Sequence, residues 1–189
     1  GNLNIQVGGG SAAAGSINLT GVISGTSILT KSGTGTLTLS GTNTYTGATV
    51  VSAGTLDLGA TDAVSSSSSL TIANGAGLAL SSSSSTVPNL TFNNTGTLSF
   101  DVASNRILTV NDTDGVTNSG AVGSITINIT GDAPAVGTYT LIDYNGTLQG
   151  TNGFNAYALG SVPAGKSYAL NNNSVSGAVE LVVTSNYIW

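Results

Sequence analysis

Apolar and polar residues alternate along most of the chain, in short runs that are separated by glycine-rich turns. The clearest runs are Gly35–Leu39 and Gly54–Leu58, which share the pattern Gly-Thr-Leu-x-Leu, and altered copies follow at residues 77–80 and 96–100. Alternation with a period of two predicts half-buried β-strands. In these strands we expect leucine to face the core and threonine to face solvent.

The runs recur at an interval of about twenty residues. Their leucines Leu37, Leu56, Leu78 and Leu98 are 19, 22 and 20 residues apart. Short strands that recur at this interval are typical of a solenoid, in which successive coils stack on one another. We therefore expect an all-β parallel β-helix (β-solenoid), and a coil of this length predicts roughly nine coils in the chain.

The character of the sequence changes near residue 121. A stronger strand is predicted at residues 125–129, and a second at residues 139–144 leads into Asn145-Gly146, which favours a hairpin. Most aromatic residues also lie in this part. Because solenoids need atypical ends, the sequence predicts solenoid repeats over residues 1–120. An irregular C-terminal β cap or assembly region, continuous with the solenoid, is expected over residues 121–189.

Charge and composition narrow the classes of partner. Charged residues make up only 6% of the chain; the three cations are Lys31, Arg106 and Lys166, and histidine and cysteine are absent. Nucleic-acid binding relies on clustered Lys and Arg, so we expect no nucleic-acid partner and no binding to an anionic membrane surface. No apolar run is long enough to cross a bilayer, so no membrane insertion is expected. No cofactor is predicted.

Paired carboxylates are the remaining route to catalysis, since the commonest general base, histidine, is missing. Two carboxylates can hydrolyse a glycosidic bond, and the candidate pairs are Asp57 with Asp62 and Asp112 with Asp114. Asp57 is expected to point outward from a strand and Asp62 to lie in a turn, where both would be solvated. We therefore expect no catalytic residue and no enzyme.

Two further patterns suggest binding sites. Residues 111–115 resemble part of a calcium loop with Asp112 and Asp114 as ligands, but the closing acidic ligand is missing, and Asp and Gly are common in ordinary turns. Thr-x-Thr pairs such as Thr36/Thr38 could form an ice-binding face. The pairs do not recur at one position in every coil, and β-propensity explains outward threonine. The simpler interpretation is favoured in both cases.

Residues 33–59 resemble the autotransporter-associated β-strand repeat. The resemblance is carried by Asn43-Thr44-Tyr45-Thr46-Gly47 and by Ala53-Gly54-Thr55-Leu56. It implies a right-handed parallel β-helix on a secreted bacterial surface protein, and so an extracellular or cell-surface location. Residues 1–5 read as the middle of a strand, which indicates a processed form or a segment of a longer chain.

A parallel β-helix exposes unpaired strand edges at its two ends. We expect the N-terminal edge to involve Leu3, Ile5 and Val7, and the C-terminal edge to involve Leu181, Val183, Tyr187, Ile188 and Trp189. Contacts between unlike ends generate a filament. The sequence therefore predicts a structural surface protein that binds itself head to tail in an extracellular filament or matrix. The alternative is an adhesin that binds surface glycans or a host surface; a polysaccharide-active enzyme and an ice-binding protein are less favoured.

Overall fold

Two parallel sheets form two sides of the molecule. The structure is a computed structural model, and it describes residues 1–9, 14–64, 67–81, 84–111, 113 and 115–186. The first sheet contains, in spatial order, β1 (Leu3–Gln6), β3 (Leu29–Ser32), β5 (Thr49–Val51), β7 (Leu70–Ile72), β10 (Leu90–Phe92), β13 (Val116–Asn118) and β16 (Leu148–Gln149). The second contains β2 (Ser16–Leu19), β4 (Thr36–Leu39), β6 (Thr55–Leu58), β8 (Ala76–Leu80), β11 (Gly96–Asp101), β14 (Ile125–Thr130) and β17 (Tyr157–Leu159).

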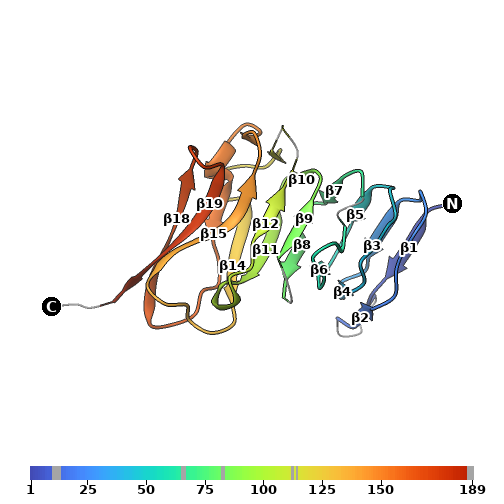
Figure 1. Ribbon diagram of the computed structural model, residues 1–189, viewed down its shortest axis with the longest axis horizontal. Helices are drawn as coiled ribbons and strands as arrows, with labels where there is room; N and C mark the ends of the chain where they lie inside the picture. The colour runs from blue at the N-terminus through green and yellow to red at the C-terminus, as the bar shows by residue number, and fades with distance from the viewer. Residues whose placement is uncertain (10–13, 65–66, 82–83, 112, 114, 187–189) are drawn as a thin grey trace.

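A third sheet joins the later coils to the C-terminal end. It contains β9 (Ser85–Val87), β12 (Leu108–Val110), β15 (Gly137–Tyr144), β19 (Ala178–Ser185) and β18 (Lys166–Asn173). Pairing is parallel from β9 to β15 and antiparallel from β15 through β19 to β18. Two short 3₁₀ helices, η1 (Val102–Ser104) and η2 (Gly153–Ala156), lie in connections. The stack is elongated, with β1 at one end and β18 and β19 at the other (Figure 1).

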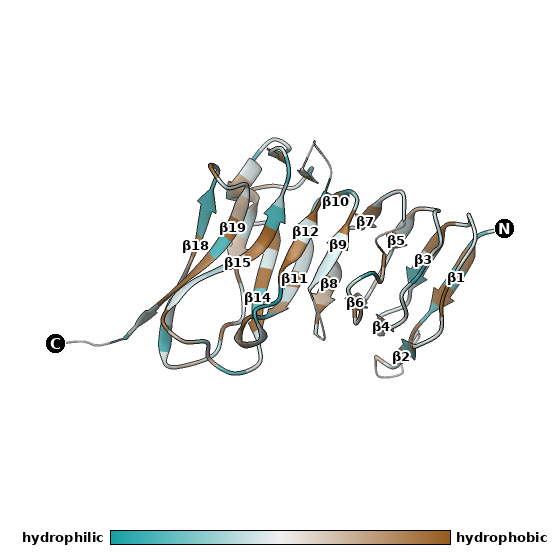
Figure 2. Cartoon of the chain, viewed as in Figure 1, coloured by the Kyte–Doolittle hydropathy of each residue, from teal (hydrophilic) through white to brown (hydrophobic). Residues whose placement is uncertain are grey.

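The observed register confirms the predicted β-solenoid. Leu37 pairs with Leu56, Leu56 with Leu78, and Leu78 with Leu98, so the regularly spaced leucines stack in one column. All four side chains are fully buried. Apolar and polar positions alternate along the strands (Figure 2), as the period of two predicts. Each coil therefore contributes its apolar face to a continuous core.

The predicted number of coils is wrong, because the later coils are longer than twenty residues. The first two sheets contain seven strands each. Along the leucine column the spacing grows to 29 residues between Leu98 and Ile127, and to 32 residues between Ile127 and Leu159.

Parallel pairing crosses residue 121 and continues to Leu159, while antiparallel pairing among the described strands is confined to β15, β19 and β18.

The hairpin predicted at Asn145-Gly146 is also wrong. The strand before this dipeptide, β15, belongs to the third sheet, whereas β16 after it pairs with β13 in the first sheet. Asn145 and Gly146 therefore form a corner of a coil. Within the described residues, no helix is long and apolar enough to span a membrane.

Candidate functional site

Asn43 connects three successive coils from inside the solenoid. Its side-chain oxygen accepts a hydrogen bond from the Ile23 amide of the preceding coil, at 2.8 Å. Its side-chain nitrogen donates to the Ala63 carbonyl of the following coil, also at 2.8 Å. Because Asn43 is 2% exposed, both backbone groups depend on this amide for a partner.

Tyr45 and Thr49 form a second buried polar connection. Their hydroxyl oxygens are 2.6 Å apart, and the Thr49 hydroxyl lies 3.1 Å from that of Ser67 in the next coil. Ser67 in turn donates to the carbonyl of Gly47 at 2.7 Å. Burial raises the pKa of Tyr45 to about 12, although the hydrogen bond with Thr49 opposes this shift. The Tyr45 phenol is therefore neutral at ordinary pH.

Lys31 is a third buried polar group, and it points into the core. Its side chain is fully buried, and its Nζ donates to the carbonyls of Ser32, Gly33 and Ala53 at 3.0, 2.8 and 2.9 Å. Desolvation lowers the pKa of Lys31 from its ordinary value. The carbonyls of Ser32 and Gly33 belong to the same coil as Lys31, and that of Ala53 belongs to the next coil. The ammonium therefore connects the turn after β3 with the turn after β5 by hydrogen bonds.

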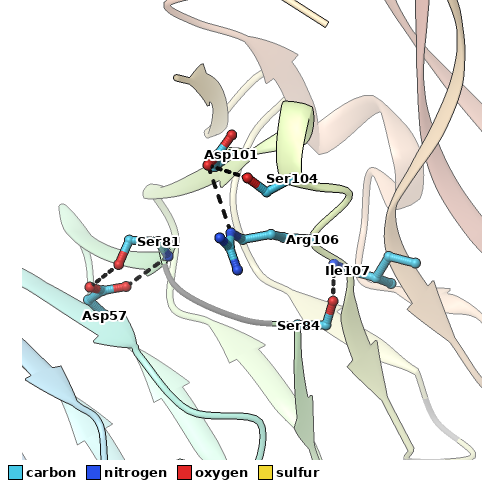
Figure 3. A network of polar contacts seen from close by, with 7 residues as sticks. All are labelled: Asp57, Ser81, Ser84, Asp101, Ser104, Arg106 and Ile107. Carbon is cyan, nitrogen blue, oxygen red and sulfur yellow. Dashed lines mark hydrogen bonds and ion pairs between the residues drawn. The ribbon is translucent and has the colours of Figure 1, made fainter. Parts of the chain in front are cut away.

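Asp57 is held by hydrogen bonds on the outer face of the second sheet (Figure 3). One carboxylate oxygen accepts from the Ser81 amide at 3.1 Å, and the other accepts from the Ser81 hydroxyl at 2.5 Å and from Thr38 Oγ1 at 3.3 Å. Asp57 is only 6% exposed, so the expectation that it is solvated is wrong. Asp62 is exposed, as expected for a turn residue.

The same view shows a second acidic residue, Asp101, close to Arg106 (Figure 3). Asp101 accepts a hydrogen bond from Ser104 at 2.9 Å, and Arg106 Nε lies 3.9 Å from its carboxylate. Asp112 and Asp114, the calcium candidates, lie outside the described residues. In the part of the chain that is described, no group of three or more metal-ligating side chains occurs.

Outward-facing threonines of successive coils stack in rows (ranks) along the solenoid, but the two threonines of a Thr-x-Thr pair do not recur together in every coil. On the second sheet one outward rank contains Ser16, Thr36, Thr55, Gly77, Thr97, Thr126 and Ala158. The rank two residues further on contains Asn18, Thr38, Asp57, Ala79, Ser99 and Asn128. A regular two-rank threonine lattice is therefore not present on the described coils.

The N-terminal coil is open. Strands β1 and β2 are the end strands of their sheets, and each has a neighbour on one edge only. Leu3 is 41% exposed, whereas Leu29, its partner in the next coil, is 1% exposed. Ile5 is partly buried and Val7 is buried. Further exposed apolar side chains of this coil are Ile17, Val22 and Ile28.

The C-terminal end is more closely covered. Leu181 and Val183 are buried, and their strand β19 is paired on both edges, with β15 and β18. The described strands that end their sheets here are β16, β17 and β18. Tyr187, Ile188 and Trp189 lie outside the described residues. The free strand edges at this end are therefore those of β16, β17 and β18, and not that of β19.

A cavity of about 240 Å³ lies beside the C-terminal strands, between the corner at residues 146–148, η2 and β18. Tyr144, Leu148 and Phe154 supply aromatic and apolar walls, while Asn172 and Ser174 supply polar groups. The Tyr144 hydroxyl donates to the Asn172 side-chain oxygen at 2.9 Å, and Phe154 stacks on Tyr157. All the lining residues are uncharged.

Lys31 and this cavity were missed by the sequence analysis. Lys31 follows Leu29 with one residue between them, so strand alternation alone places its side chain inside the solenoid. The cavity had no comparable signal, because residues 144, 154 and 172 approach one another only through the third sheet and η2.

The stacked parallel sheets define the protein as a β-solenoid. Residues 29–58 match the family model of the passenger-associated-transport-repeat, which confirms the resemblance to autotransporter-associated repeats seen at residues 33–59. Neither a curated protein nor a solved structure matches the chain. The matched repeat is one associated with passenger transport, and it points to a secreted or cell-surface protein.

Proposed function

We propose that this chain is a structural segment of a secreted bacterial surface protein and that it assembles head to tail. The observation that carries the proposal is the open first coil. Ile17 is 38% exposed, whereas Leu37, the next member of its column, is fully buried. Stacking one more coil on β1 and β2 would bury the first coil as fully as its successors.

A second copy offers suitable strands at its opposite end. Strands β16 and β17 end the same two sheets that begin with β1 and β2, and all pairing within these two sheets is parallel. Placing β1 of one copy on β16 of another, and β2 on β17, would continue both ladders in the same direction. Main-chain hydrogen bonds would supply the adhesion, and a contact between unlike ends that does not close into a ring extends into a filament.

A charge placed on the open coil is expected to abolish this assembly. The Ile17→Lys variant puts an ammonium where the incoming coil would have to desolvate it. We expect wild-type protein to form concentration-dependent oligomers in sedimentation velocity and filaments in electron microscopy, and Ile17→Lys to stay monomeric with an unchanged circular dichroism spectrum. Val175→Lys is the matched control, since Val175 is 98% exposed on the turn between β18 and β19. Filaments of Ile17→Lys like those of wild type, or monomeric wild type at every concentration, would contradict the proposal.

The cavity beside β18 favours an adhesin as the second candidate function. A lining that combines aromatic rings with amide and hydroxyl groups suits an uncharged sugar ring, which stacks by its apolar face and hydrogen-bonds by its edge. On a glycan array we expect binding to neutral glycans, and a loss of at least about tenfold in affinity for Asn172→Ala, which corresponds to one lost hydrogen bond. Asn171→Ala is the control, because Asn171 is exposed and bonds to Glu180 instead. Equal affinities for the two variants would argue against this site.

A further inference from the structure

Lys31 is flanked by apolar side chains in its column, in which the next buried polar residue, Asn118, lies beyond Phe92. Along the inner face of the first sheet its neighbours in successive coils are Ile5, Val51, Ile72 and Phe92. Val51, Ile72 and Phe92 are fully buried, as is Lys31. Burying an ammonium is costly unless it is paired or well hydrogen-bonded. The position therefore needs a specific reason for a cation.

Carbonyl oxygens supply that reason. Three of them lie between 2.8 and 3.0 Å from Nζ, so all three ammonium hydrogens have an acceptor. Lys31 takes no part in the ion pair found among the described residues, which joins Arg106 to Asp101. The positive charge of Lys31 is thus balanced by backbone dipoles and not by a carboxylate.

Two glycines shape the backbone around Nζ. Gly33 and Gly54 have φ angles of +75° and +66°, in the left-handed region that glycine adopts without strain. A Cβ on Gly54 would lie 2.8 Å from Nζ. The lack of a side chain at residue 54 therefore leaves Nζ its place among carbonyl oxygens of two adjacent coils.

We propose that the carbonyls of Ser32, Gly33 and Ala53 form an internal monovalent-cation site, which the chain fills with its own Lys31 ammonium. Inward-facing carbonyls can replace the hydration shell of a cation, as they do in ion-selective pores. The observed distances suit ammonium or potassium, whereas Ca²⁺ and Mg²⁺ need oxygens at about 2.0–2.6 Å. Removing the tethered ammonium should leave a site that a free cation of similar size can occupy.

The test is chemical rescue of the Lys31→Ala variant. Its urea unfolding is measured in ammonium, potassium, sodium or tetramethylammonium chloride at equal ionic strength. We expect Lys31→Ala to be destabilised in sodium and tetramethylammonium chloride and to recover in ammonium chloride, and partly in potassium chloride. Once the ammonium concentration exceeds its dissociation constant, each tenfold increase should raise the folding equilibrium constant about tenfold. Wild type should respond equally to ammonium and sodium. If Lys31→Ala does not fold in sodium chloride, refolding in ammonium chloride serves as the readout.

Two further variants separate a cation site from a simple cavity. Ile72→Ala removes a buried side chain from the same column but not from the carbonyl cluster, so its stability should not distinguish the four salts. Lys31→Met fills the column without a charge; it should be destabilised and should not recover in ammonium chloride. Equal responses of Lys31→Ala to ammonium and sodium, rescue of Ile72→Ala by ammonium, or wild-type stability of Lys31→Met would each overturn the proposal.

Discussion

The Gly54→Ala variant is expected to lose about 2–5 kcal/mol of its free energy of unfolding, from left-handed strain together with overpacking. Gly54 has a φ of +66°, which costs an L-residue free energy. In addition, a Cβ at this position would collide with the carbonyl oxygens of Gly35 and Gly33 in the preceding coil and with Lys31 Nζ. Two of these three obstacles are backbone atoms, so they cannot move away as a flexible side chain would.

Gly75→Ala provides the matched control for Gly54→Ala. Gly75 has a similar φ of +77°, but a Cβ there would meet no atom within 4 Å. Its replacement should cost only the strain of about 1–2 kcal/mol. The difference between the urea midpoints of the two variants measures how closely adjacent coils approach at the corner before β6. Equal midpoints would show that the coils are not packed in this way.

Replacing Asn43 by alanine is the other change with a large expected effect, about 2–5 kcal/mol from one partly buried and one buried hydrogen bond that are lost together. The amide of Ile23 and the carbonyl of Ala63 are hydrogen-bonded to the Asn43 side chain. Alanine satisfies neither, and the buried position limits replacement by water. The measurement is urea unfolding followed by circular dichroism, with hydrogen exchange of the Ile23 amide as a local readout.

Asn74→Ala is the control for Asn43→Ala. Asn74 also connects adjacent coils, since its oxygen accepts from the Thr95 amide at 3.2 Å and from the Thr95 hydroxyl at 2.6 Å. Asn74 is exposed, so water can replace these bonds and the loss should stay below about 1 kcal/mol. A loss as large for Asn74 as for Asn43 would mean that burial does not set the energetic weight of these connections.

The solenoid itself is determined by the sequence. Alternation of leucine and threonine specifies which side of each strand is buried. The spacing of Leu37, Leu56, Leu78 and Leu98 then fixes which residues stack, because shifting a coil by one residue would turn its leucines outward. These are local and periodic properties, so one sequence is sufficient to predict them.

The tertiary structure alone decided the number of coils, the corner at Asn145-Gly146 and the environment of the polar residues. The later coils contain long connections whose length carries no periodic signal. The Asn145-Gly146 corner depends on β13 as the partner of β16, about thirty residues away in sequence. The burial of Asp57 depends on Ser81, which belongs to a later coil. Similarly, the Asn43 side chain connects coils because it hydrogen-bonds to the Ile23 amide and the Ala63 carbonyl. In each case the partner comes from another coil, and the local sequence contains no information about which group that coil will present.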